Sequence, residues 1–95
     1  MVGYVYLMAN QPNGTIYLGA TSDTIRRAYQ HRNGLIDGFT KKHGWSLLVW
    51  YERFDTLQDA RNREYQMKSW KRAWKLKAIE KSNPAWRDLY DELMR

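Results

Sequence analysis

Cysteine is absent from this chain of 95 residues, and proline occurs only twice. Without cysteine, neither disulfides nor Cys-based zinc sites can form. No apolar run approaches the roughly 20 residues that a membrane-spanning helix needs. The N-terminus also lacks the basic start and long apolar stretch of a signal peptide. We therefore expect one domain (1–95) with a cytoplasmic location and no membrane partner.

Acidic residues are scarce between positions 61 and 81, where eight Lys and Arg side chains accompany only two glutamates. The rest of the chain carries equal numbers of both signs, so the whole net charge of +6 lies in this segment. A localised basic surface is typical of proteins that bind nucleic acid, because cationic side chains displace the counterions of phosphates. A solvated, lysine-rich helix face would give the same pattern, and charge alone does not separate the two.

Apolar residues and turn residues together predict three strands. Residues 2–9, 15–21 and 45–54 are rich in aromatic and branched side chains. The Asn, Pro and Gly residues between the first two stretches predict a hairpin. With helices before and after the third strand, this order indicates the α+β class, as a small three-stranded antiparallel sheet flanked by helices.

Capping residues mark the helices. Ser22 or Asp23 can begin a helix that ends near Leu35. Thr56 with Asp59 resembles a capping box that opens a long helix, or the first of two successive helices. A short final helix is predicted over 86–94. The loop between the first helix and the third strand is polar and basic.

Glu64 stands out as an acid on the long basic helix. The helical period places it on the same face as Ala60 and Met67, which should be buried. A buried carboxylate without a partner is costly, so Glu64 needs a cation, a hydrogen-bond cluster or a metal ion. A buried salt bridge with an arginine satisfies this need as well as a metal ion does.

Two other pairs have both a functional and an ordinary interpretation. Arg27 and His31 are four residues apart beside the apolar arc of the first helix, where they face either a cleft or only solvent. Tyr6 and Tyr17 lie on the hairpin strands, where aromatic residues are ordinary core residues. Their side chains share a face if the register places them opposite one another, which the sequence does not fix.

Taken together, these residues resemble the GIY-YIG nuclease superfamily. Tyr4-Val5-Tyr6 and Tyr17-Leu18-Gly19 are similar to its two tyrosine motifs, although Tyr4 replaces a glycine and Leu18 an isoleucine. The stretches GFTKKHG, EYQMKSWKRAWK and SNPAWRDL resemble the small stand-alone bacterial branch related to the nuclease module of the excision-repair protein UvrC. The resemblance covers about residues 2 to 89.

The resemblance implies a metal-dependent endonuclease whose catalytic residues are Tyr6, Tyr17, Arg27, His31 and Glu64. Glu64 would bind Mg²⁺ or Mn²⁺, since a hard cation that keeps several waters needs only one or two protein ligands. Arg27 would stabilise the charge on the scissile phosphate, and the tyrosines would bind that phosphate and the nucleophilic water. His31 would orient the water or share proton transfer, and the identity of the general base stays open.

The implied partner is DNA, with RNA left open and no small-molecule cofactor. The expected substrates are branched, flapped or damaged repair structures, although family enzymes with known targets often carry a DNA-recognition domain for which this chain has no room. The expected phosphate contacts are Lys41, Lys42, Lys68, Lys71, Lys75 and Lys77. Asn83 is a tentative residue near the metal, or a turn residue that ends a helix.

Two further classes of protein fit the sequence. A binding module that has lost cleavage would use the basic segment, with Trp70 and Trp74 stacking on unpaired bases. Both tryptophans lie at one edge of the apolar arc, so core packing explains them as well. A structural or adaptor protein would keep the five candidate residues only incidentally.

Overall fold

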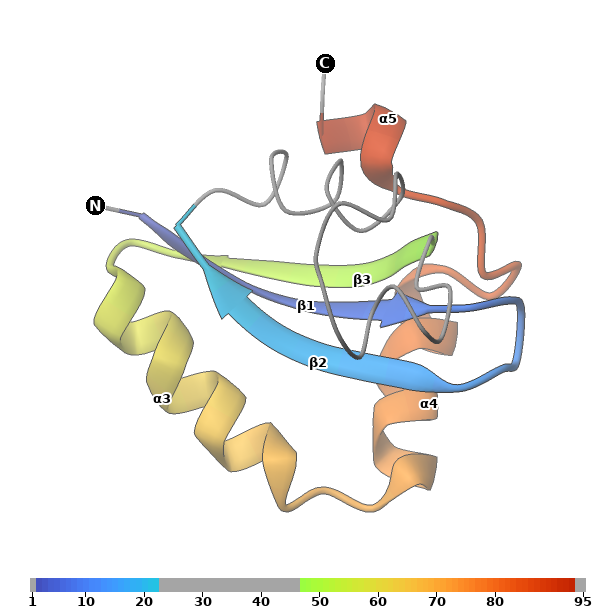
Figure 1. Cartoon of the computed structure of the whole chain (residues 1–95), viewed down its shortest axis with the longest axis horizontal. Helices are drawn as coiled ribbons and strands as arrows, with labels where there is room; N and C mark the ends of the chain where they lie inside the picture. The colour runs from blue at the N-terminus through green and yellow to red at the C-terminus, as the bar shows by residue number, and fades with distance from the viewer. Residues whose placement is uncertain (1, 23–46, 94–95) are drawn as a thin grey trace.

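The first strand of the protein, β1 (Gly3–Ala9), occupies the centre of a three-stranded antiparallel sheet (Figure 1). In this computed structural model, which describes residues 2–22 and 47–93, the strand order is β2-β1-β3. Strand β2 (Ile16–Thr21) and strand β3 (Leu47–Phe54) pair with either side of β1. The predicted α+β class and the three-stranded sheet are confirmed, and β2 is an edge strand.

The hairpin turn between β1 and β2 forms as its residues predict. The side chain of Asn10 accepts a hydrogen bond of 3.0 Å from the amide of Thr15. Asn13 adopts a left-handed conformation with φ 59°, which asparagine tolerates better than most residues. The turn fixes the register, in which Met8 pairs with Tyr17 and Tyr6 with Gly19.

The two faces of the sheet have different partners. On one face, the β1 side chains Val5, Leu7 and Ala9 pack in a core with side chains of the long helices. On the opposite face lie Tyr6 and Met8. Because side chains on both faces of β1 are buried, its residues form a nearly continuous apolar run. The register between β1 and β3 shifts between Leu7 and Met8.

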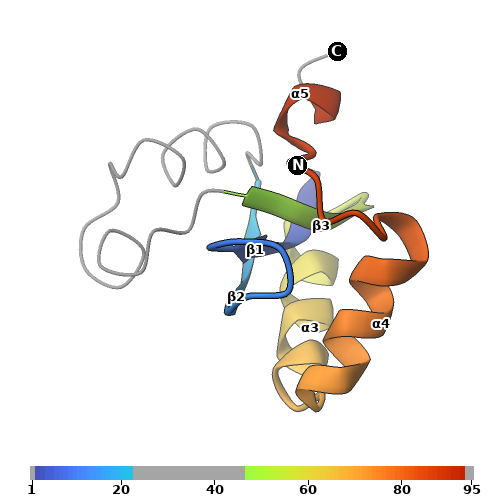
Figure 2. The same ribbon diagram turned by 90° about the vertical axis from the view of Figure 1, so that its right-hand side faces the viewer.

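Two helices cover the first face, which is the second of the two alternatives that the sequence leaves open. Helix α3 (Leu57–Lys68) begins at Thr56, whose hydroxyl accepts a hydrogen bond of 3.1 Å from the amide of Asp59, as the capping pattern predicts. Helix α4 (Arg72–Ser82) follows after a short break, and Figure 2 shows both helices on the same side of the sheet. At the break, Trp70 packs against the core.

Close contacts fix both helices on the sheet. A side chain at Gly3 would place its Cβ 2.7 Å from the Cα of Leu57, so only glycine allows the start of α3 to lie against β1. The guanidinium of Arg72 donates a hydrogen bond of 2.7 Å to the carbonyl of Gly14 in the hairpin turn. This hydrogen bond holds the start of α4 against the turn that joins β1 and β2.

The prediction that the final helix begins at residue 86 is wrong, because the helix begins at Tyr90. Trp86 has φ 56°, a left-handed conformation that a helix cannot contain, and its side chain is buried in the core. The chain then passes along β3, where the amide of Leu89 donates a hydrogen bond of 2.7 Å to the carbonyl of Leu48. Only the short helix α5 (Tyr90–Leu93) follows, on the second face of the sheet.

Several predictions fall on residues 23–46, outside the part of the chain that the structure describes. They are the helix expected to end near Leu35, together with Arg27, His31, Lys41 and Lys42. Among the helices that are described, none combines the length and apolar character needed to cross a bilayer.

Candidate active site

Tyr6 and Tyr17 lie together on the second face of the sheet. Their ring centroids are 6.4 Å apart, with an angle of 40° between the ring planes. They are diagonal neighbours rather than direct partners, because Tyr17 pairs with Met8. Tyr6 is 3% exposed, whereas Tyr17 on the edge strand is half-buried. The pair therefore consists of one buried ring on the central strand and one half-buried ring on the edge strand β2.

Gly19 makes room for the ring of Tyr6. A Cβ at this position would lie 2.5 Å from the phenolic oxygen of Tyr6 and 2.6 Å from its Cζ. Because the ring is buried and rigid, it cannot move aside without disturbing its neighbours. Gly19, the last residue of the second tyrosine motif, therefore fixes the position of the first tyrosine. This role of Gly19 has no counterpart in the sequence pattern, which marks the residue only as part of the motif.

Two more tyrosines extend the aromatic surface toward β3. Tyr51 is opposite Tyr6 in the register, and its ring lies 6.5 Å from that of Tyr4 in an edge contact. The Tyr51 hydroxyl donates a hydrogen bond of 2.9 Å to a carboxylate oxygen of Glu92. Burial, followed by this bond to the carboxylate, raises the pKa of Tyr51 above its usual value. Tyr51 therefore stays a neutral phenol at physiological pH and contributes no base there.

Glu64 lies on α3, which packs on the other face of the sheet. Successive helical residues are about 100° apart, so Arg63 and Glu64 lie on opposite flanks of the line through Ala60 and Met67. The Arg63 flank faces β3, because the Nε of Arg63 is 3.3 Å from a carboxylate oxygen of Glu52 on that strand. The Glu64 flank therefore faces the β2 side.

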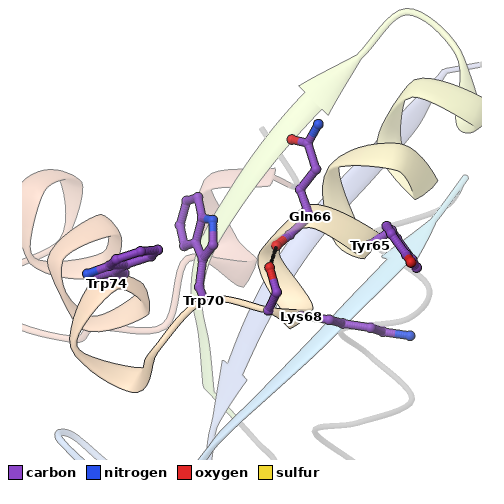
Figure 3. A pocket seen from close by; sticks show the side chains of 6 residues that line it. Tyr65, Gln66, Lys68, Trp70 and Trp74 are labelled. Atoms are coloured by element: carbon purple, nitrogen blue, oxygen red, sulfur yellow. Dashed lines mark hydrogen bonds between the residues drawn. The ribbon is translucent and has the colours of Figure 1, made fainter.

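The side chains next to Glu64 agree with this placement. Lys68, one turn further along, has its Nζ 3.9 Å from a carboxylate oxygen of Glu64. Figure 3 shows Lys68 and Tyr65 directed toward the side of α3 on which β2 lies, and Gln66 directed away from it. Glu64 thus lies on the flank of α3 nearest the sheet edge that carries Tyr17.

Burial at Glu64 is less complete than its position in the sequence suggests. Ala60 and Met67 are fully buried as predicted, but the Glu64 side chain keeps 22% of its exposure. Its ion-pair partner among the described residues is Lys68, and not an arginine. A partly exposed carboxylate in an exposed pair of 3.9 Å is held only weakly, so it is available to another cation.

The donors around Glu64 decide whether a divalent cation fits. Within residues 2–22 and 47–93, no group of three or more His, Asp or Glu side chains could enclose a metal ion. Mg²⁺ and Mn²⁺ do not need such a group, because waters and substrate oxygens complete their octahedral coordination. Glu64 is therefore suited to be a single protein ligand, and not part of a closed metal cage.

The lysines expected to contact phosphates have different environments. Lys68 ends α3, and Lys71 is the exposed residue before the first turn of α4. Lys77 is exposed on α4, whereas Lys75 is only partly exposed. The spacing of Glu64 and Lys68, four residues apart on one helix, was a sequence signal for their pairing that sequence analysis did not use.

Asn83 has partners that favour its interpretation as a turn residue. It ends α4 and is 2% exposed. Its side-chain amide donates to the carbonyls of Val49 at 3.1 Å and Arg87 at 2.8 Å. Its side-chain oxygen accepts from the amide of Arg87 at 3.2 Å. These bonds connect α4, β3 and the turn that buries Trp86.

Replacement of Asn83 by alanine should therefore lower stability. Asn83→Ala would leave three buried or half-buried backbone groups without their partner, and we expect a loss of about 2 to 4 kcal/mol in the free energy of unfolding. Urea denaturation measures this loss, with Ser82→Ala on the exposed side of the same helix turn as control. Unchanged stability together with weaker Mn²⁺ binding would instead support a place for Asn83 near the metal.

Comparisons with known proteins agree on one family. The sequence profile described as "GIY-YIG catalytic domain" matches residues 2–77. A UPF0213 protein of Staphylococcus saprophyticus is 37% identical over 76 residues, which are 80% of this chain and 92% of that protein. A UPF0213 protein of Pediococcus pentosaceus is 31% identical over 84% of each chain. The solution NMR structure of a UPF0213 protein from Bacillus halodurans matches with a TM-score of 0.56 and 28% identity, over 90% of each chain.

Proposed function

Because this chain belongs to the GIY-YIG nuclease family, we propose that it is a divalent-metal-dependent endonuclease that hydrolyses phosphodiester bonds in DNA. The observation that supports this proposal is that three candidate residues lie near strand β2. Tyr6 and Tyr17 form a pair on the second face of the sheet, with Tyr17 on β2 itself, and Glu64 lies on the flank of α3 that faces the same strand from the first face.

Glu64 is the residue that would hold the cation, and GIY-YIG nucleases generally depend on a divalent metal. A bound Mg²⁺ or Mn²⁺ would polarise a phosphate oxygen and offset charge that develops on it. The negative charge of Glu64, partly shielded from water, attracts such an ion more strongly than a fully solvated carboxylate does. Lys68, its present partner, is then free to interact with a phosphate.

The two tyrosines would bind and orient the substrate. Each phenol can donate a hydrogen bond to a phosphate oxygen and accept one from a water molecule. A phenol at its ordinary pKa of about 10 is a poor base at neutral pH, so a nearby cation must lower that pKa before a tyrosine can take a proton. Packing against Gly19 keeps the phenol of Tyr6 in place.

We assign the remaining catalytic roles to Arg27 and His31 on the basis of the family motif. The guanidinium of Arg27 would stabilise the phosphate in its transition state, for which a bidentate donor is well suited. His31 would orient the attacking water or share its proton. Lys41 and Lys42 remain proposed phosphate contacts because they belong to a polar, basic stretch of the sequence.

The experiment that tests this function is a nicking assay on purified protein. We expect cleavage of flapped or branched DNA in the presence of Mg²⁺ or Mn²⁺, and none when the cation is removed by chelation. Cleavage that continues undiminished in chelator would contradict the role of Glu64. Absence of cleavage on flapped, branched and plain DNA with either ion would contradict the proposed activity itself.

A second candidate function, nucleic-acid binding without cleavage, is favoured by the exposed aromatic residues beside the lysines. Trp74 is 52% exposed and Tyr65 is 79% exposed. These rings add nothing to the core and can stack on bases. The two candidates differ in Glu64, which a binding protein does not need.

Phosphate binding by the basic segment should appear in the salt dependence of DNA binding. In a plot of log affinity against log salt concentration, we expect a shallower slope for the double variant Lys71→Ala/Lys75→Ala than for wild type. The slope should decrease by roughly one unit for each phosphate that is no longer neutralised, on plain and branched duplexes alike. A salt titration monitored by fluorescence anisotropy measures this slope. Arg53→Ala, which changes an exposed cation on β3, serves as control. An unchanged slope in the double variant would mean that these lysines form only a solvated face.

A further inference from the structure

Two hollows meet at the tryptophans of the α3–α4 junction. The first, of about 710 Å³, is lined by Tyr65, Gln66, Lys68, Ser69, Trp70 and Trp74. The second, of about 460 Å³, continues along α4 past Lys77, Ala78 and Lys81. Figure 3 shows Trp70 and Trp74 projecting to one side of the junction, and Tyr65 and Lys68 to the other. We call the two hollows together the tryptophan groove.

The tryptophan groove combines apolar rings with lysine side chains, of which Lys68 is paired with Glu64. Trp74 is half exposed, and its ring meets that of Trp70 edge-on at 6.4 Å. The guanidinium of Arg63 lies 5.0 Å from the centroid of Trp70, in a cation–π contact. Among the described residues, no ion pair neutralises Lys77 or Lys81, and no acidic side chain lines either hollow.

These features select the chemistry of the occupant. Exposed indole rings bind flat apolar surfaces, whereas the lysines around them attract phosphates. A base-paired duplex hides the faces of its bases, so only a strand with unpaired bases offers both groups to the same groove. A second copy of this chain is disfavoured, because it would bring two clusters of lysines together.

We propose that the tryptophan groove binds a nucleic-acid strand whose bases are unpaired, with one or two bases stacked on Trp74 and the phosphates held by Lys77 and Lys81. Lys68 lines the first hollow and also contacts Glu64, so this hollow lies one side chain away from the candidate metal ligand. The part of this inference that concerns cleavage rests on the proposed function, whereas the binding itself does not.

The test compares binding of labelled oligo(dT) of about 12 nucleotides with binding of a blunt duplex of the same length. We expect Trp74→Ala to weaken oligo(dT) binding about tenfold and to leave duplex binding nearly unchanged, since stacking on one ring contributes this order of affinity. Trp74→Phe, which keeps a stacking surface, should remain close to wild type. Thermal unfolding confirms that the exposed substitution leaves the fold intact.

Two variants of equal charge test the lysines. Lys77→Ala/Lys81→Ala should weaken oligo(dT) binding more than Lys71→Ala/Lys75→Ala does, because the second pair does not line the groove. Equal oligo(dT) affinity of Trp74→Ala and wild type would overturn the proposal. So would a dimer that Trp74→Ala dissociates without any change in oligo(dT) affinity, because the groove would then be a contact between copies.

The result also separates the groove from the proposed nuclease. Glu64→Gln should bind oligo(dT) at least as tightly as wild type, because it removes a negative charge beside the groove. A protein that cleaves no DNA but loses oligo(dT) binding in Trp74→Ala would refute the nuclease and support the groove. If the protein cleaves in a Glu64-dependent way but wild type and Trp74→Ala bind oligo(dT) equally, the groove is refuted and the nuclease is supported.

Discussion

Gly19→Ala is expected to reduce the rate of DNA cleavage by about a hundredfold while the protein remains folded. The new Cβ would lie 2.5 Å from the phenolic oxygen of Tyr6, and the buried ring would have to move by several tenths of an ångström or more. A displacement of about 1 Å at a group that positions a substrate can cost this much in rate. Single-turnover cleavage, measured together with thermal unfolding, gives both effects.

Leu18→Ile is the matched control for Gly19→Ala. Leu18 is the neighbouring residue on the same strand, but it packs against the core on the other face of the sheet. The exchange conserves volume and should cost less than about 1.5 kcal/mol, with little effect on cleavage. If folded Gly19→Ala cleaved at the wild-type rate, the position of Tyr6 would not matter to the reaction.

Glu64→Gln should have the largest effect, a loss of about a thousandfold or more in the rate of cleavage. The amide keeps the size of the side chain but removes the charge that holds a divalent cation, whose stabilisation of the transition state amounts to several kcal/mol. Affinity for DNA should stay nearly the same, because lysines elsewhere on α3 and α4 supply the phosphate contacts. Cleavage and binding are therefore measured on the same samples.

A control variant addresses the ion pair of Glu64. Lys68→Gln removes the partner of Glu64 but keeps the carboxylate, so metal-dependent cleavage should persist at a reduced rate. Because the exposed pair at 3.9 Å contributes at most about 1 kcal/mol, neither substitution should unfold the protein. Unfolding of Glu64→Gln would instead mean that the carboxylate has a structural role. Equal turnover by Glu64→Gln and wild type would exclude it as the metal ligand.

Local patterns predicted most of the described fold. The strands and the Thr56 cap depend on neighbouring residues, and both β1 and β3 end at the predicted residue. The sequence left open whether one helix or two follow Thr56, because no proline or glycine marks the break between α3 and α4. The burial of Trp70, a tertiary contact, accompanies that break. Trp86 was placed in a helix for the same reason, since only the core that surrounds its ring favours its left-handed backbone.

The sequence pointed to candidate residues, but it did not predict how far each would be buried or which of them would be in contact. The helical period placed Glu64 on the apolar side of α3, yet its side chain is 22% exposed, which the period alone does not predict. The contact of Tyr6 with Tyr17 depends on a register that the hairpin turn sets. The role of Gly19 could not be read from spacing, because it consists of the space that a ring from another strand fills.

The central claim is that Glu64 and the tyrosine pair form one active site near β2, in which Glu64 holds the metal ion. Paramagnetic broadening by Mn²⁺ tests this claim most directly. We expect Mn²⁺ to broaden the NMR signals of the Tyr17 ring far more than those of Tyr51, because Tyr51 lies on β3 and each strand adds roughly 5 Å of distance. This broadening should disappear in Glu64→Gln. Equal broadening of Tyr17 and Tyr51, or broadening of Tyr17 that persists in Glu64→Gln, would contradict the claim.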